Sequence, residues 1–341
     1  MSKKDIIIQQ LDKTKLKEIL THWGLEGFVN TLFPRFEKCN NIIYFLSKHD
    51  REYVLRVSFR SDRPTDMLIA ETDFVNYLRS NKVDVTYPIP TSSQNYVVTI
   101  ELGEISINCV LFTKAPGIPM PKNKHQYKRC ITVNEYFYDI GKKMGNMHRL
   151  STNYTPNIRH KKRFELIDYI ENVLMDKYLP SKYPVLREKF QDLISESKRL
   201  PKDNKCFGLI HADICDSNIL VDMETSKLTL FDFDDCAYCW FMYDIANVWS
   251  KGFAWIKNEI TIEEKKFKFS DRFEKIMSGY QSEHNLSNYW LAKLSFFLKL
   301  VEMQELMTIF QKAALNEMEI DYTDDLKNRI ECMESGRSYF R

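Results

Sequence analysis

Apolar and polar residues alternate in short runs along the first third of the chain, a pattern typical of half-buried β-strands. Four runs fit this description: Ile42 to Leu46, Tyr53 to Ser58, Tyr96 to Ile100 and Ile105 to Phe112. Helical periodicity precedes them around residues 13–31. The pattern therefore predicts an antiparallel sheet that follows one helix.

A second helix is predicted between the second and third runs, within residues 63–81. The apolar positions that share one face of it are Leu68, Val75 and Leu78. Glu71 falls on that face, where an ionised carboxylate is costly unless a cation meets it. Arg56, in the second strand, is the nearest candidate partner. The alternative is that Glu71 lies at the edge of the face, in solvent.

From Pro116 onward the periodicity becomes helical, over residues 131–150, 164–178 and 183–198. Later apolar positions continue it, namely Phe273, Ile276, Met277 and Tyr280. We expect an α+β protein of two lobes. The predicted boundaries are an N-terminal lobe at 1–112, a connector rich in proline at 113–121 and a mainly helical lobe at 122–341.

Composition narrows the classes of partner. The 49 lysines and arginines nearly balance the 47 aspartates and glutamates, so no overall field favours nucleic acid or an anionic membrane. No segment approaches the ~20 apolar residues of a membrane-spanning helix, and the N-terminus offers only the run Ile6 to Ile8. We expect a cytoplasmic protein without a membrane or nucleic-acid partner.

Acidic and amide residues gather at the ends of short apolar runs between residues 206 and 249. Ile210 leads into His211 and Asp213, Asn218 precedes another run, and a third run leads into Asp232. Loops at strand ends are where catalytic groups usually lie. The bland alternative is that these are turn and cap residues, which Asp and Asn often are.

Phosphoryl transfer to an alcohol needs this set of groups: a carboxylate that accepts the hydroxyl proton, and oxygen ligands for Mg²⁺. Asp213 would face the acceptor hydroxyl. The Asn218 amide and the Asp232 carboxylate would hold the metal ion. The segment therefore predicts a phosphotransferase site.

Two motifs carry a family resemblance. HADICDSN (211–218) matches HxDxxxxN, and LFDFDD (230–235) matches the metal-aspartate motif of the aminoglycoside phosphotransferase and choline kinase family. YDIA, with Asp244, follows them. The resemblance spans roughly residues 35–250. It implies a bilobal protein-kinase-like fold, with a small antiparallel sheet lobe carrying one key helix and a larger mainly α lobe, and ATP with Mg²⁺ as cofactors, GTP remaining open.

The resemblance also implies individual roles. Asp213 corresponds to the catalytic base, and Asn218 and Asp232 to the metal ligands. His211 resembles a brace for the loop, and Asp244 resembles a buried aspartate that hydrogen-bonds the backbone of the catalytic loop.

Upstream, YVLRVS resembles the strand that carries the cation for the nucleotide phosphates. Arg56 stands there where many relatives have lysine, and Glu71 resembles its helix partner. LFTKAPG (111–117), with Phe112 and Lys114, resembles the hinge against which adenine docks. The expected phosphate loop, 37–45, contains no glycine, and Asn41 takes the place of an asparagine that many relatives use there.

We expect the acceptor to be a small molecule with a hydroxyl group. Asp216, Asp234 and Asp235 lie on the same loops and would give its pocket a negative lining suited to an ammonium group. The equally weighted alternative is that they are exposed acids paired with lysines. DFDD followed by YDIA looks closest to the homoserine-kinase-like and uncharacterised bacterial branches, whereas HADICDSN also resembles the aminoglycoside branch. A metabolic kinase and a resistance enzyme both stay open.

Two other classes remain as alternatives. A protein kinase of the same fold is disfavoured because only eleven residues separate Asp232 from Asp244, too few for an activation segment. A nucleotide-binding module without catalysis would explain the glycine-free loop and Arg56. The complete set of acids and amide argues against it.

Overall fold

The computed structural model describes residues 3–33, 40–119, 122, 133–156, 163–252, 262–315 and 323–339. Two compact units emerge from the contacts between residues. Unit 1 consists of Met1–Pro116, Thr155–Lys162 and Thr229–Asp234, and unit 2 consists of Gly117–Tyr154, Arg163–Leu228 and Asp235–Arg341. Each unit is therefore built from segments that are distant in the sequence.

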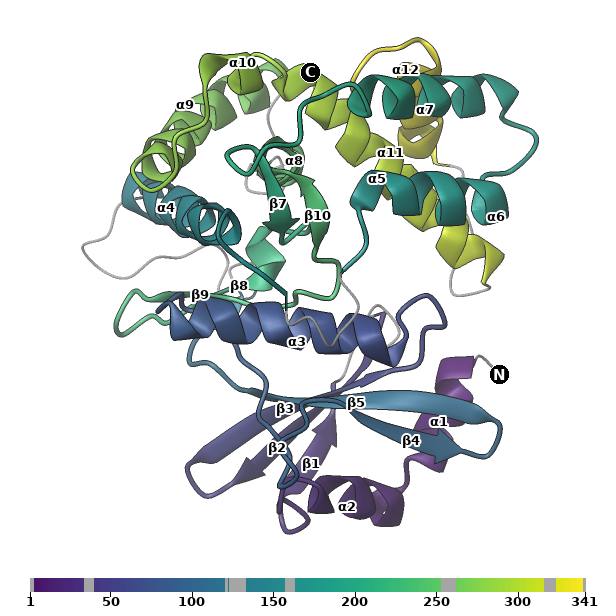
Figure 1. Ribbon diagram of the computed structural model, residues 1–341, viewed down its shortest axis with the longest axis vertical. Coiled ribbons are helices and arrows are strands. Elements are labelled where there is room, and N and C mark those ends of the chain that lie inside the picture. The colour runs from purple at the N-terminus through teal and green to yellow at the C-terminus, as the bar shows by residue number, and fades with distance from the viewer. Residues whose placement is uncertain are drawn as a thin grey trace. The chain divides into compact units, whose positions relative to one another are not determined.

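Unit 1 contains a five-stranded sheet in the order β1-β2-β3-β5-β4, and every neighbouring pair is antiparallel. The strands are β1 (Val29–Leu32), β2 (Ile42–Lys48), β3 (Arg51–Ser58), β4 (Val98–Leu102) and β5 (Ile105–Thr113). The helices are α1 (Lys3–Gln10), α2 (Lys13–Thr21) and α3 (Thr65–Ser80), and Figure 1 shows α3 running along the sheet. The four predicted strands are confirmed.

Alternation along β3 assigns its two faces. Leu55 and Val57 belong to a core cluster that also contains Ile7, Ile19 and Leu20 of α1 and α2. The intervening residue Arg56 contacts α3 on the opposite face, through Glu71. The sheet is thus covered by α1 and α2 on one face and by α3 on the other.

The predicted helix over residues 13–31 is wrong in its second half. Helix α2 ends at Thr21, and Gly24 follows with φ of +66°. Glycine adopts this left-handed conformation at little cost and commonly stops a helix there. The chain then turns and forms β1, which pairs with β2.

The segment Thr229–Asp234 belongs to unit 1 although it lies late in the chain. Strand β9 (Leu228–Leu230) reaches it. The Leu230 amide donates to the Asp84 carbonyl at 3.0 Å, and its carbonyl accepts from Thr86 at 3.0 Å. Phe233 meets the ring of Phe74 on α3 edge to face, with centroids 6.1 Å apart. These contacts place Asp232 in the unit that carries Arg56.

Unit 2 is mainly helical (Figure 1). Its helices are α4 (Val133–Ser151), α5 (Leu166–Tyr169), the π-helical turn η3 (Ile170–Met175), α6 (Asp176–Tyr178), α7 (Pro184–Ser197), α8 (Phe241–Gly252), α9 (Ile262–Gln281), α10 (Asn288–Leu291), α11 (Leu294–Ala314) and α12 (Asp324–Glu334). The predicted helices correspond to α4, to the run from α5 through α6, and to α7. Residues 131 and 132, in the first prediction, lie outside the described residues.

Short strands of unit 2 flank the predicted catalytic loop. Strand β7 (Phe207–Ile210) pairs with β10 (Ala237–Trp240), and β8 (Ile219–Val221) pairs with β6 (Ile118–Pro119), both antiparallel. The loop between β7 and β8 contains the 3₁₀ turn η4 (Asp216–Asn218). A small antiparallel sheet and a mainly helical remainder confirm the predicted α+β class. None of the helices in the described ranges is long and apolar enough to cross a bilayer.

Candidate active site

The loop after β7 holds a strained backbone at its second residue. Ala212 has φ of +65°, a region that costs an alanine about 1–2 kcal/mol. Such conformations persist only where surrounding contacts determine them. The neighbours of this loop should therefore hold its backbone firmly.

Helix α8 supplies those contacts. The buried Asp244 carboxylate accepts hydrogen bonds from the amides of His211 at 3.0 Å and Ala212 at 2.8 Å. Asn247 donates from Nδ2 to the Ala212 carbonyl at 2.7 Å. The backbone contact implied for Asp244 by the family resemblance is thus present.

Two buried histidines complete this part of the loop. His211 Nδ1 accepts from the Asp213 amide at 3.3 Å, so that the imidazole contacts the backbone of the loop. His148, on α4, places Nε2 3.1 Å from an Asp244 oxygen and Nδ1 3.0 Å from the Tyr280 hydroxyl. Sequence reasoning did not single out His148. Only the folded contact with α8 shows its part in supporting the loop.

Asp213 lies in the middle of the loop, and both of its carboxylate oxygens have partners. Asn218 donates from Nδ2 to Asp213 Oδ2 at 2.7 Å and to its carbonyl at 3.0 Å. Lys251, in the last turn of α8, forms an ion pair with Oδ1. Since Asn218 uses its nitrogen on Asp213, its amide oxygen lies outside these bonds and can serve another partner.

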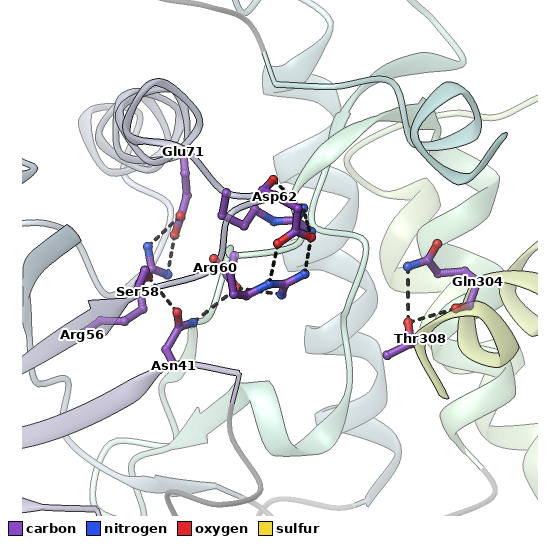
Figure 2. Close-up of polar contacts among 10 residues, drawn as sticks. Asn41, Arg56, Ser58, Arg60, Asp62, Glu71, Gln304 and Thr308 are labelled. Carbon is purple, nitrogen blue, oxygen red and sulfur yellow. Dashed lines mark hydrogen bonds and ion pairs between the residues drawn. The ribbon is translucent and has the colours of Figure 1, made fainter. Parts of the chain in front are cut away.

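Unit 1 carries the other candidate residues. Arg56 donates from Nη1 and Nη2 to the two Glu71 oxygens at 2.8 and 2.7 Å, and the side chains are only 5% and 1% exposed. The predicted pair is present (Figure 2). Burial opposes the charge of Arg56, but Glu71, Asp234 and Asp232 raise its pKa above the ordinary value. Arg56 therefore remains a cation beside Asp232.

Like Ala212, Asp232 has a left-handed backbone conformation, with φ of +66°. Aspartate tolerates this conformation better than most residues. Two residues on, the buried Asp234 carboxylate accepts from Asn41 Nδ2 at 3.3 Å and lies 3.7 Å from Arg60 Nη1. Figure 2 shows Asn41 also accepting from the Ser58 hydroxyl, at 2.7 Å. The segment that carries Asp232 is thus tied to Asn41, directly before β2, and to Arg60 in the loop after β3.

The two hinge candidates lie on and just after β5. The Arg56 guanidinium lies 5.0 Å from the centre of the Phe112 ring. Lys114 pairs with Glu52 at 2.7 Å, and both side chains are substantially exposed. Their role against adenine stays a prediction. Residues 37–39 of the predicted phosphate loop, and 120–121 of the predicted connector, lie outside the described residues.

Comparison with known proteins decides the class. The sequence matches the phosphotransferase enzyme family over residues 38–264. The chain belongs to that family. Amicoumacin kinase of Bacillus subtilis (strain 168) is 27% identical over 311 residues, covering 89% of this chain and 89% of that protein.

Solved structures share the fold of this chain. Amicoumacin kinase hAmiN, in complex with AMP-PNP, Ca²⁺ and Ami, matches the phosphotransferase with a TM-score of 0.80 at 23% identity, over 98% of this chain and 96% of that chain. A microcompartment-associated aminopropanol kinase matches with a TM-score of 0.69 at 21% identity, over 95% of each chain. The predicted kinase-like fold is confirmed, and the protein is a small-molecule phosphotransferase.

Unit 2 of the phosphotransferase contains a cavity of about 440 Å³. Its lining residues are Asp213, Cys215, Asp216, Ser217, Ser250, Lys251, Glu305, Arg329 and Tyr339. Among the three acids proposed for the acceptor, Asp216 lines this cavity beside Asp213. Asp234 instead lies buried in unit 1 with Asn41, and Asp235 belongs to unit 2 outside the lining. Asp213, Asn218 and Asp232 are divided between the units, so their convergence on one metal ion stays a prediction.

The cavity of the phosphotransferase also contains charges that the sequence did not reveal. Arg329 of α12 donates from Nε to Glu302 at 2.6 Å and from Nη2 to Glu305 at 2.5 Å. Glu305 lines the cavity, whereas Glu302 is buried. The sequence does contain a signal for this cluster, since Glu302 and Glu305 stand among apolar residues. Their partner Arg329, however, lies 24 to 27 residues further along the chain.

Proposed function

We propose that this phosphotransferase transfers the γ-phosphoryl group of ATP to a hydroxyl of a small, amine-bearing molecule. Asp213 is the general base, and Asn218 and Asp232 hold Mg²⁺. Arg56, positioned by Glu71, and Asn41 act on the nucleotide phosphates. Phe112 and Lys114 lie on the side where adenine docks.

The placement of Asp213 carries the proposal. Its carboxylate opens onto a cavity large enough for a small molecule, and its loop is held by buried hydrogen bonds from α8. Two oxygens have about four acceptor sites, and the bonds from Asn218 and Lys251 occupy one on each oxygen. A hydroxyl donor entering the cavity can therefore still bond to the carboxylate.

The remaining groups fit a nucleotide with its metal ion. Asn218 keeps its amide oxygen, a hard ligand of the kind Mg²⁺ takes, outside its bonds to Asp213. Arg56 uses both terminal nitrogens on Glu71, and its buried Nε has no hydrogen-bond partner among the described residues. This N–H group of the Arg56 cation is suited to donate to an anionic ligand such as a phosphate.

The chemistry at the loop is a single displacement. The acceptor oxygen forms a bond to the γ-phosphorus while the bond from that phosphorus to the bridging oxygen breaks, and ADP leaves with that electron pair. The hydroxyl proton passes to the Asp213 carboxylate. Magnesium, when bound, neutralises charge on the phosphate oxygens. The chain contributes orientation of the acceptor and fixed positive charge from Arg56.

The acceptor class is inferred from the cavity and from relatives. The cavity lining carries three carboxylates, those of Asp213, Asp216 and Glu305, and two cations, Lys251 and Arg329. The excess of one negative charge favours a cationic acceptor. The similar proteins carry the names amicoumacin kinase and aminopropanol kinase. We infer that the acceptor of this chain carries an amine near the hydroxyl that receives the phosphoryl group.

A panel of acceptors tests the proposal. Amicoumacin, aminopropanol, choline, homoserine and an aminoglycoside are incubated with ATP and Mg²⁺. Acceptor-dependent ADP release is followed, and each product mixture is inspected by mass spectrometry for an added phosphoryl group. Transfer to at least one amine-bearing acceptor is expected. A serine-containing peptide in the same assay tests the protein-kinase alternative.

Two variants assign the chemistry. Asp213→Ala and Asp232→Ala should each lower kcat by orders of magnitude while the far-ultraviolet spectrum stays unchanged. Asp203→Ala, which alters an exposed turn carboxylate in unit 2, is the matched control. Near-normal turnover in either site variant would refute its assigned role, and no transfer to any acceptor would refute the proposed acceptor class.

A further inference from the structure

Helix α8 presents one polar face to the catalytic loop. Asp244, Asn247 and Lys251 are spaced i, i+3 and i+7, so they lie on the same side of the helix. Asp244 accepts from the amides of the loop's first two residues, and Asn247 donates to the carbonyl of the second. Lys251 contacts the side chain of the third, Asp213. Three successive loop residues are thus held by three successive polar positions of one helix.

Lys251 differs from the other two because its contact lies in the cavity. Its side chain is 30% exposed and that of Asp213 is 29% exposed, and both line the same walls. Asn218 contacts the other carboxylate oxygen of Asp213 from within the loop. The carboxylate is therefore bound from two sides, which fixes its rotation about the side-chain bond.

The charge of Lys251 is secure at neutral pH. Burial opposes it, but Asp213 and, more weakly, Glu305 raise the pKa of Lys251 above its ordinary value. The other cation of the cavity lining, Arg329, is already bound to Glu302 and Glu305. Lys251 is thus a fixed cation against the proposed base.

We propose that Lys251 is a positioning residue for the transfer reaction, holding the Asp213 carboxylate in the orientation that receives the acceptor hydroxyl. This inference rests on the proposed function. It does not require Lys251 to touch ATP. Loss of the lysine should lower kcat and leave the KM for ATP unchanged, because the base is misdirected while the nucleotide groups are untouched.

The kinetic test compares three variants with the wild type. Lys251→Met keeps the length of the side chain without its charge, Lys251→Arg keeps the charge, and Lys198→Met removes an ion pair with Glu171 elsewhere in unit 2. We expect Lys251→Met to lose on the order of 10- to 100-fold in kcat, as misplacement by about 1 Å can cause. Lys251→Arg should recover part of that loss, and Lys198→Met should match the wild type.

A double-variant cycle separates action through Asp213 from a general structural effect. In an Asp213→Ala background, Lys251→Met should cause no further loss, since the group it orients is gone. The proposal is overturned if Lys251→Met keeps kcat within twofold of wild type. It is also overturned if the loss is equally large in the Asp213→Ala background.

An independent measurement covers the case in which the proposed function itself is wrong. Amine labelling of Lys251, followed by mass spectrometry, needs no acceptor or nucleotide. The contact predicts slow labelling of Lys251 in the wild type and faster labelling in Asp213→Asn, with Lys327 as the exposed reference. Equal labelling rates would remove the contact on which the inference depends. No turnover by the wild type, with protected Lys251, would refute the proposed function alone.

Discussion

At the scale of single residues, the pair between Arg56 and Glu71 shows how burial changes the contribution of an ion pair to stability. Its two hydrogen bonds are short and both side chains are almost fully buried. Lys114 and Glu52 form a pair of similar length in the same unit, but with side chains 37% and 50% exposed. In the buried pair each charge depends on the other for solvation, whereas water solvates the exposed charges.

Removal of one partner should therefore affect stability very differently at the two places. Glu71→Ala leaves a buried guanidinium uncompensated, and we expect a loss of about 3–5 kcal/mol in the free energy of unfolding. Glu52→Ala, the matched control, should cost less than about 1 kcal/mol. Urea titration of both variants provides the measurement. Equal losses would contradict the assigned burial of the pair.

The pairing of Arg56 with Glu71 could be predicted from sequence because it depends on local geometry. Helical phase placed Glu71 on an apolar face, and Arg56 in the second predicted strand was the nearest cation. Lys251 and Arg329 could not be found in this way. Their partners are determined by the docking of α8 and α12 against other segments, which no local period encodes.

At the scale of elements, the crossing of α4 and α9 depends on glycine. A β-carbon at Gly141 would collide with the Ile276 carbonyl, and one at Gly279 would collide with the Tyr138 carbonyl. Each helix thus meets the backbone of the other, without intervening side chains. Helix α4 also carries His148, which contacts Asp244. The close approach therefore supports α8, the helix that holds the loop carrying Asp213.

Gly279→Ala should destabilise the protein in spite of the better helix propensity of alanine. Propensity favours the variant by about 1 kcal/mol, but backbone atoms cannot move aside as a flexible side chain can, and overpacking typically costs about 1–3 kcal/mol or more. Ser278→Ala, at the exposed neighbouring position, tests propensity alone. Thermal unfolding should show a lower Tm for Gly279→Ala only. A Tm at or above that of Ser278→Ala would contradict the close crossing.

Helices and strands were predicted well where the hydrophobic periodicity extends over many residues. The prediction failed where a single residue ends a helix. The strands from β2 to β5 and the helices α3, α4 and α7 follow the predicted patterns closely. The helix predicted to continue to residue 31 stops before Gly24, because a left-handed residue interrupts the hydrogen-bond ladder. Helix α1 and strand β1 are short and were not predicted.

At the scale of the whole molecule, one late segment of the chain belongs to the unit formed mainly by the N-terminal residues. Thr229–Asp234 follows the loop that carries Asp213 in sequence but belongs to unit 1, where Leu230 bonds to Asp84 and Thr86. A division of the chain into consecutive segments therefore cannot reproduce the two units, because the chain returns to unit 1 at Thr229–Asp234. The motif alone still proposes Asp232 as a site residue, since its signal is the residue type at the end of an apolar run.

Stability of the folded chain should depend on pH through Glu302. This carboxylate is buried, accepts from Arg329 with Oε1, and has no hydrogen-bond partner for Oε2 among the described residues. Burial raises its pKa from 4.5 to about 7, against the opposing pull of Arg329. Between these values the folded chain retains a proton that the unfolded chain has released, so this group's contribution to stability falls as pH rises.

Glu302→Gln removes that titration and keeps the shape of the side chain. The Tm of the wild type minus that of the variant should therefore decrease as pH rises from 5 to about 7.5, with most of the change below the folded pKa. Differential scanning calorimetry at half-unit steps of pH gives both curves under the same buffers. A constant difference in Tm across this window would mean that Glu302 titrates alike in the folded and unfolded chains, and that its pair with Arg329 compensates its burial in full.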